Sequence, residues 1–490
     1  MAITKVTGAM LGNYTGGSAD DTVVIGDGAG DAITSGVDNT FIGDNAGTAT
    51  TSGGTNVAVG NEALAANTTG GSNTAVGAGA GKTATSYDAT YVGYNAGTLA
   101  NAAGVTLVGA YAGDAITSGG GNTALGYYSL SATTTGANNT AVGQSSLGAN
   151  TTGANNVAVG HNCLDANTTG ASNTAVGLSS LSANTTASDN TAVGKNSLRD
   201  NTTGASNTAV GLGALATNTT AANNTAVGYF ALVANTTGSE NSAVGQNALD
   251  SNTTGTANTC VGQASLSAAT TGSSNIGIGV DAGVTLTTGT NNVLIGKLAG
   301  SYDGNDITTG TNNVLVGNFN KVSAADAANQ IVLGYYVTST GNNNFTFGNS
   351  TTDSNISFGA TSITAPSDIR LKENIQDEEV GLDFINDLRP VTFQWKKEKD
   401  IPSDMKAYKE GSETRTMNGK YNHGFIAQEV KEVIDNYNLK EGFEMWQEDE
   451  ADGRQRIGEA ALMPMMVKAV QELSAEIEEL KNTKCKCNEE

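Results

Sequence analysis

Short apolar runs that end in glycine recur along the first three quarters of the chain. Runs such as VVIG, NVAVG and NTAVG close at a glycine, and ten equal steps of 17 residues lead from Gly126 to Gly296. Earlier steps are of 16 or 17 residues, and beyond Gly296 the spacing becomes irregular. Regular spacing of one short motif is typical of a solenoid in which each repeat forms one coil. We therefore predict a mainly β protein with a parallel β-solenoid over residues 21–300, then irregular repeats and a neck over residues 301–366.

Residues within one coil alternate in character. Thr225 and Val227 fall on one side of the predicted strand, and Ala226 falls on the other. Gly228 permits a bend, Leu232 adds a second apolar position, and the sequence Asn-Thr-Thr-Gly then forms a polar turn. One Val and one Leu bury little apolar surface in each coil. The free energy gained by this burial barely offsets the loss of backbone entropy on folding. We therefore expect stability to come from stacked coils and from neighbouring chains.

The small residue in the middle of each strand suggests where chains meet. Alanine occupies this position in most coils, and cysteine replaces it once, in NTCVG. A small side chain lets another copy of the chain approach closely. We therefore assign Ala175, Ala226 and Cys260 to the interface of a homotrimer.

The composition changes near residue 366. Six of the 24 Lys and Arg residues precede residue 367, so 24 − 6 = 18 follow it. The later pattern predicts a helix over 378–388, a strand over 389–396 and a strand that runs into a helix over 421–437. We expect residues 367–490 to form a separate small α/β domain, and residues 1–20 to form an attachment or cap segment.

The last predicted helix has an apolar stripe at alternating steps of three and four residues. This spacing is that of a coiled coil, which would bring three chains together along one seam. A single amphipathic helix packed on its own domain is the alternative. The stripe consists of Met463, Met466, Val470, Leu473, Ile477 and Leu480.

Charge and composition exclude several classes of function. The net charge is −23, with 47 acidic against 24 basic residues, so we expect no nucleic-acid partner. No signal peptide and no apolar stretch of membrane-spanning length is visible, so we expect no membrane insertion. Four scattered cysteines favour synthesis in a reducing cytoplasm.

No cofactor or metal site is expected. The acidic residues Asp20, Asp21, Asp27 and Asp31 lack a calcium-loop pattern. The C-x-C pair near the end of the chain lacks a second pair of zinc ligands.

The NTAVGxxAL coils resemble the left-handed parallel β-roll heads of YadA-like trimeric autotransporter adhesins and related coils in phage tail fibres. The resemblance covers about residues 20–360 and implies a left-handed solenoid in a homotrimer. The coil of this chain is longer than that of the adhesins. A hexapeptide left-handed helix is the alternative solenoid, but it requires an aliphatic residue at every sixth position, and no third one follows Val227 and Leu232.

Four ordered motifs in the C-terminal part carry a second resemblance. SDIRLKENI, LRPVTFQWK, HGFIAQEV and ALMPMMVKAVQEL are similar to the intramolecular chaperone auto-processing domain of phage tailspikes and fibres, the peptidase S74 family. The resemblance implies that Ser367 is a nucleophile, that Lys372 is its base and that the chain breaks between Ser367 and Asp368. A simple N-to-O acyl shift would instead break the bond that precedes Ser367. A serine needs a base, and a lysine becomes one when burial favours its neutral form.

Three further residues of these motifs are candidates for supporting roles. His423 matches a family position that supports the active site, by orienting Ser367 or by polarising the scissile carbonyl, or else it is a packed structural histidine. Gln428 offers a hydrogen bond to an oxyanion, although a structural amide is the simpler interpretation. Arg370 and Asp368 are expected to form a local ion pair that fixes the loop.

These expectations combine into a trimeric phage tail fibre, located in the virion and made in the host cytoplasm. Its partners would be a host cell-surface receptor or glycan and other virion tail proteins. The alternatives are a tailspike that depolymerises glycans and an adhesin on a bacterial surface. Glycan hydrolysis needs two carboxylates at a fixed separation, and Glu62 and Glu240 are the only glutamates before Glu373. We therefore favour binding, with self-cleavage by Ser367 and Lys372 as the single reaction.

Overall fold

The structure is a computed structural model that divides the chain into two compact units, residues 1–366 and residues 367–490. Each unit is described by itself. The described residues are 21–350, 352–360, 363–364, 367, 369–403, 405, 407–417, 419–439, 443, 445–448 and 454–487.

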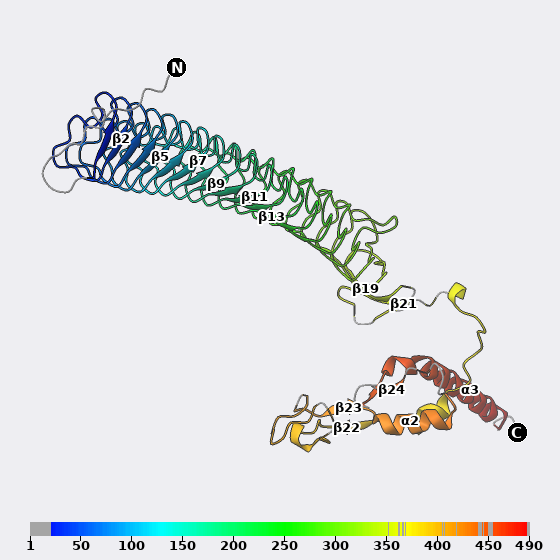
Figure 1. Ribbon diagram of the computed structural model, residues 1–490. Helices are drawn as coiled ribbons and strands as arrows, with labels where there is room; N and C mark the ends of the chain where they lie inside the picture. Colours follow the sequence, from blue (N-terminus) through cyan, green and yellow to red (C-terminus); the bar gives the residue numbers. More distant parts are fainter. Residues whose placement is uncertain are drawn as a thin grey trace. The chain divides into compact units, whose positions relative to one another are not determined.

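The first unit is a solenoid in which each coil contributes one short strand to a single parallel sheet (Figure 1). The predicted parallel β-solenoid of 17-residue coils is confirmed. The three-residue strands are β1 (Val23–Ile25), β2 (Thr40–Ile42), β3 (Val57–Val59), β4 (Thr74–Val76), β5 (Thr90–Val92), β6 (Thr106–Val108), β7 (Thr123–Leu125), β8 (Thr140–Val142), β9 (Val157–Val159), β10 (Thr174–Val176), β11 (Thr191–Val193), β12 (Thr208–Val210), β13 (Thr225–Val227), β14 (Ser242–Val244), β15 (Thr259–Val261), β16 (Ile276–Ile278), β17 (Val293–Ile295) and β18 (Val314–Val316).

Three longer strands end the solenoid. β19 (Gln330–Tyr335) and β20 (Asn344–Asn349) continue the parallel sheet, and β21 (Thr352–Ser357) pairs with β20 in the antiparallel direction. The reversal of direction at β21 stops the coil pattern, as the irregular glycine spacing in this region indicates.

Equivalent residues of successive coils lie directly above one another. Val227 of β13 pairs with Val244 of β14, and the glycines that follow them stack as well. Gly228 has φ +141°, and a Cβ atom there would lie closer than 3.0 Å to the carbonyl oxygen of Gly245. Glycine is required at this position because the next coil occupies the space of a side chain.

The middle residue of each strand points into its own coil. Ala175, Ala226 and Cys260 have no exposed surface within a single chain, and they belong to one continuous core. Leu232, which has φ +53°, fills the same interior from the opposite side of the coil. The assignment of Ala175, Ala226 and Cys260 to an interface between chains is therefore wrong. The alternation was predicted correctly, but the alanine face is the inner one.

A buried ladder of asparagines runs along the solenoid beside the strands. Asn207 Nδ2 donates to Asn190 Oδ1 at 3.2 Å and to the carbonyl oxygen of Ala221 at 2.9 Å. Asn207 Oδ1 in turn accepts from the backbone nitrogen of Asn224 at 3.0 Å. These side chains have no exposed surface, and each coil satisfies the polar groups of the next. The sequence analysis placed asparagine only in turns and missed this ladder.

The outward face of the sheet carries a stripe of aliphatic side chains, which we call the sheet stripe. It consists of the third strand residues, such as Val193, Val210, Val244, Val261 and Ile278, which are 36–42% exposed. The first residue of each strand lies on the same face and is most often threonine, valine or isoleucine. In one chain this face of the sheet is uncovered.

The second unit is a small domain built on a short core. Phe384, Val430, Met445, Leu462 and Met465 are buried together. Its elements are η1 (Ile369–Leu371), α1 (Leu382–Asp387), β22 (Val391–Phe393), η2 (Glu398–Asp400), β23 (Asn422–Gly424), α2 (Ala427–Asn436), β24 (Trp446–Glu448), β25 (Gln455–Ile457), η3 (Glu459–Leu462) and α3 (Met463–Cys487). The predicted helices and strands occur in the predicted order, with shorter bounds.

The final helix, α3, packs on its own domain by a different face from the predicted heptad stripe. Met465 and Ala469 are buried against the domain. The stripe residues Met463, Met466, Val470, Leu473, Ile477 and Leu480 are 42–64% exposed. The helix thus packs on its own domain, as the alternative expected, but through Met465 and Ala469 in place of the stripe, and the coiled coil stays a prediction. Among the described residues, no helix combines the length and the hydrophobicity that crossing a membrane requires.

Candidate active site

Ser367 and Lys372 meet at the start of the second unit. The single turn η1 (Ile369–Leu371) lies between them, and the backbone nitrogen of Lys372 donates to the carbonyl oxygen of Ile369 at 3.2 Å. This turn folds the segment back, so that Lys372 Nζ lies 2.8 Å from Ser367 Oγ, within hydrogen-bonding distance. The structure therefore brings together the two residues that the motif predicted as nucleophile and base.

Both members of this pair are exposed to solvent in one chain. An amine in water is stable as the ammonium ion, and burial is what favours the neutral form that takes a proton. The geometry for proton transfer from Ser367 to Lys372 is present, but the apolar surroundings that would activate Lys372 are not supplied by the described part of this chain.

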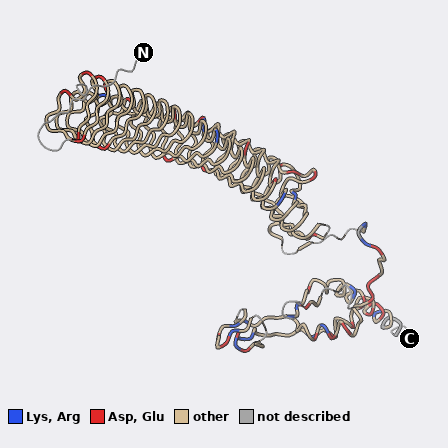
Figure 2. Tube along the Cα trace, in the orientation of Figure 1, with Lys and Arg blue, Asp and Glu red and all other residues tan. Residues whose placement is uncertain are grey.

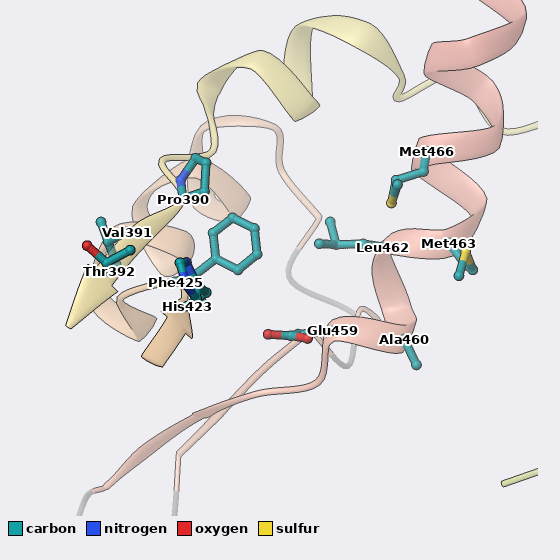
Figure 3. A pocket seen from close by; sticks show the side chains of 11 residues that line it. Pro390, Val391, Thr392, His423, Phe425, Glu459, Ala460, Leu462, Met463 and Met466 are labelled. Carbon is teal, nitrogen blue, oxygen red and sulfur yellow. The ribbon is translucent and has the colours of Figure 1, made fainter. Parts of the chain in front are cut away.

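His423 lies in a pocket of about 770 Å³ on the same unit (Figure 3). It sits on β23 opposite Thr392 of β22, and Glu459 of η3 lines the same pocket. Met463 and Met466 of α3 line the other side. Neither Ser367 nor Lys372 lines this pocket, and the described residues show no hydrogen bond between that pair and His423. The support of Ser367 by His423 therefore stays a prediction.

Glu459 was not singled out from the sequence. It lies 36 residues after His423, outside the four motifs, and belongs to a short helix whose place depends on the fold. No local pattern links a carboxylate at that distance to a histidine on a strand.

The remaining supporting candidates lie on separate elements of the domain. Gln428 of α2 lines a second pocket together with Phe393, Trp395 and Met417, and it does not line the pocket of His423. Arg370 lies in η1, directly between the two members of the pair in sequence. Asp368 is outside the described residues, so the predicted cleavage junction and the ion pair with Arg370 are not tested.

Ion pairs fix the outer part of the domain. Arg389 bonds Glu429, and this hydrogen bond lowers the pKa of the Glu429 carboxyl. Lys397 and Lys399 both bond Glu413, and the hydrogen bond from Lys397, followed by that from Lys399, lowers the pKa of Glu413 to about 2. The bonds to Glu413 stabilise the segment between β22 and β23, whereas the pair Arg389–Glu429 joins the segment before β22 to α2, and all of these contacts lie at the surface.

The two glutamates of the solenoid do not form a hydrolytic pair. Glu62 follows β3 and is paired with Lys82 at 2.6 Å, whereas Glu240 precedes β14. Eleven strand spacings of about 4.8 Å separate these coils by about 50 Å. Glycosidase carboxylates lie about 5–10 Å apart. Among the described residues, no three His, Cys, Asp or Glu side chains come together as a metal site.

Comparison with known proteins finds a family match in the C-terminal part of the chain. Residues 367–439 match the family Peptidase S74, described as chaperone of endosialidase. The match begins at Ser367 and includes Lys372, His423 and Gln428. The C-terminal part of the chain therefore contains a domain of this family. No curated protein and no solved structure matches the chain.

Proposed function

We propose that this chain is the subunit of a homotrimeric fibre of the phage-tail type, whose C-terminal domain assembles three chains and then cuts itself off. The hydrogen bond of 2.8 Å between Lys372 Nζ and Ser367 Oγ carries this proposal. The pair lies at the first residue of the second compact unit, where the family match also begins. A break at this place separates the solenoid from the domain that helped it fold.

The reaction uses these two side chains in a fixed order. Neutral Lys372 takes the hydroxyl proton of Ser367, and Ser367 Oγ attacks a backbone carbonyl carbon. The amide nitrogen of the broken bond receives the proton from Lys372, and one water molecule then hydrolyses the ester on Oγ. Attack on the carbonyl of residue 366 breaks the bond before Ser367, whereas the family resemblance places the break after it. The products of the two routes differ in mass by one serine residue.

The exposure of the pair ties cleavage to assembly. Ser367 and Lys372 are exposed to solvent in a single chain, and burial is what favours the neutral form of an amine. Neighbouring chains that cover Ser367 and Lys372 would favour the neutral amine. Cleavage then follows trimer formation, and the chaperone domain is removed only after it has aligned three chains.

Two uncovered stripes support the trimer. The heptad stripe of α3 exposes Leu473 by 42% and Ile477 by 51%, on the face turned away from its own domain. The sheet stripe runs from β1 to β18, which at about 4.8 Å per strand is about 80 Å long. With a width of about 10 Å it offers about 800 Å² per chain, the size of a stable interface. We assign the contact between solenoids to this outward face in place of the alanine face.

The assembled fibre would bind a host cell-surface receptor and be held in the virion by other tail proteins. The two glutamates of the solenoid lie too far apart to act together in hydrolysis, which speaks against a glycan depolymerase that would use them. The self-processing domain favours a virion fibre over an adhesin of a bacterial surface, because removal of the domain leaves a fibre that no longer depends on it.

The test is a denaturing gel and an intact mass spectrum of the purified full chain. Wild type is expected to give two products that separate at residue 366 or 367. Ser367→Ala and Lys372→Ala are each expected to give one full-length chain that is still trimeric in native mass spectrometry.

Matched controls are available on α3. Ser474→Ala and Lys481→Ala change an exposed serine and an exposed lysine of the same domain, and both variants should be cut like wild type. If wild type and Ser367→Ala show the same single full-length band, the domain is a retained trimerisation cap and the self-cleavage proposal is wrong.

A further inference from the structure

Four tyrosines form an exposed cluster on three successive coils of the solenoid. We call Tyr94, Tyr111, Tyr127 and Tyr128 the tyrosine cluster. Tyr111 and Tyr128 are stacked with ring centroids 4.9 Å apart and planes 5° apart. Tyr94 meets Tyr111 edge to face at 5.4 Å, and Tyr127 meets Tyr128 in the same way at 4.3 Å.

The backbone under the two stacked rings is in a costly conformation. Tyr111 has φ +57° and Tyr128 has φ +56°, which is the left-handed region. Many other coils use asparagine or glycine at this position, two residues after the closing glycine, as at Asn162, Asn247 and Gly213. A bulky residue there costs about 1–3 kcal/mol, and such strain is typical of functional positions. Bulky residues also take this conformation at Phe230, Leu298 and Tyr336, so the clustering of two stacked tyrosines on neighbouring coils, and not the strain alone, marks this site.

The rings also remain available for a ligand. Tyr94 is 54% exposed, Tyr127 is 48% exposed and Tyr128 is 37% exposed. In a second aromatic group, at the end of the solenoid, a lysine already lies against the rings. Lys321 Nζ is 5.3 Å from the ring centroids of both Tyr302 and Tyr336. Among the described residues, no cation lies over the rings of the tyrosine cluster.

The surroundings of the cluster are almost without charge. Residues 89–164 contain one acidic residue, Asp114, and no lysine or arginine. Figure 2 shows the same scarcity of charge along the middle of the solenoid. With a net charge of −23, the chain repels polyanions, so a strongly acidic polymer does not fit this surface.

The size of the cluster argues against a protein partner. Four half-exposed tyrosines at about 200 Å² each offer about 400 Å², which is half of what one side of a stable protein interface buries. Tyrosine combines a flat apolar ring with a hydroxyl that donates and accepts. A pyranose sugar has the complementary features, with an apolar C–H face and a rim of hydroxyls.

We propose that the tyrosine cluster is a binding site for a neutral carbohydrate chain, with sugar rings lying against Tyr94, Tyr111, Tyr127 and Tyr128. The inference rests on the proposed function, because it gives the solenoid of the fibre its ligand. Three copies in a trimer would raise the apparent affinity for a surface that displays many such chains. Polar side chains on the next coil, Gln144 and Ser145, extend the site along the solenoid.

The test uses the full-length chain on a printed array of neutral and acidic oligosaccharides, with maltohexaose and cellohexaose as soluble probes in saturation-transfer NMR. The double variant Tyr111→Asn, Tyr128→Asn carries the residue that other coils tolerate at this position. We expect at least tenfold weaker binding to every neutral glycan that wild type recognises, with a melting temperature that does not fall. Loss of binding without loss of stability separates a ligand site from a structural role.

The matched control is Phe230→Asn, the same change at an equivalent left-handed position outside the cluster. It should retain wild-type binding. Three outcomes overturn the proposal: no glycan bound by wild type, equal binding by the double variant, or selective binding of acidic glycans or protein. None of these readouts depends on cleavage at Ser367, so failure here is distinct from failure of the proposed function.

Discussion

The solenoid and the C-terminal unit differ in where their side chains find partners. In the solenoid, the inward alanine and leucine of each coil and the asparagine ladder are satisfied within one chain. In the C-terminal unit, the serine–lysine pair is exposed and α3 presents an apolar stripe to solvent. The solenoid has a complete interior as a single chain, whereas the groups of the second unit that carry function lack their surroundings. The proposed self-cleavage is therefore the part that assembly would control.

The strongest test of this contrast is a charge in the heptad stripe. Ile477→Lys places three ammonium groups at one level of the proposed coiled coil, and we expect at least a tenfold loss of trimer in native mass spectrometry. The fold of the single domain should persist, because Ile477 is 51% exposed within its own chain. Ala475→Lys, which adds the same charge on the opposite side of α3, should assemble normally. Equal assembly of both variants would remove α3 from the interface.

The sheet stripe gives a second test. Val244→Arg places a large charged side chain on the outward face of β14, where we expect a severalfold lower trimer yield. Thr237→Arg changes an exposed turn residue of the preceding coil and should have little effect. If the turn variant is the more damaging of the two, the solenoids meet through another face.

The asparagine ladder tests the self-sufficiency of the solenoid. Asn207→Ala removes the oxygen that accepts hydrogen bonds from the backbone and side-chain nitrogens of Asn224. It also removes the side-chain nitrogen that donates to the carbonyl oxygen of Ala221. Unsatisfied buried groups cost about 1–3 kcal/mol each, so we expect a loss of about 2–4 kcal/mol in unfolding free energy.

Hydrogen exchange measures this effect locally, because a solenoid opens near the damaged coil. Faster exchange should be confined to the coils next to Asn207. Thr203→Ala, an exposed position in the same coil, should change stability by no more than about 0.5 kcal/mol. Uniform loss of protection along the whole solenoid would contradict coil-by-coil stability.

The smallest expected effect is the acid sensitivity of the C-terminal unit. The folded-state pKa of Glu413 is lowered from 4.5 to about 2 by its hydrogen bonds to Lys397 and Lys399. A lowered carboxyl pKa contributes stability above pH 4.5, and that contribution is lost as the pH falls from about 4.5 to about 2. The pair is at the surface, so the change should be slight and weaker in high salt. NMR titration of the Glu413 carboxyl should show this low midpoint, and Glu413→Gln should remove the matching change in melting temperature.

Much of the fold could be predicted because the chain repeats itself. The closing glycines indicated the coils, and the alternation of Thr225, Ala226 and Val227 indicated a strand. The choice of inner face could not be made in this way, because alternation is symmetric and alanine is suited to both a tight core and a close interface. Buried asparagine was missed because a ladder satisfies its amide only when coils are stacked in register, which no local pattern reveals.

The candidate site could be predicted from a short local motif and not from repetition. Such a motif identifies the residues but not their surroundings. Ser367 and Lys372 are five positions apart, and one short turn brings them together. His423 and Glu459 come from distant segments of the sequence. They line the same pocket only because the fold brings β23 and η3 together. In the proposed trimer, the covering of Ser367 and Lys372 would come from further copies of the chain, which no single motif encodes.

The stacking of identical coils has a consequence for alignment between chains. Two solenoids with equal repeats can align in several registers of nearly equal energy, because copies displaced by one coil keep nearly all of their contacts. The steps of 16 residues that end at Gly93 and Gly109, and the step of 21 that ends at Gly317, break this translational symmetry. Coils of unusual length in two chains lie beside each other only when the chains are in one register. The irregular coils would thus leave the chains of the proposed trimer a single correct alignment.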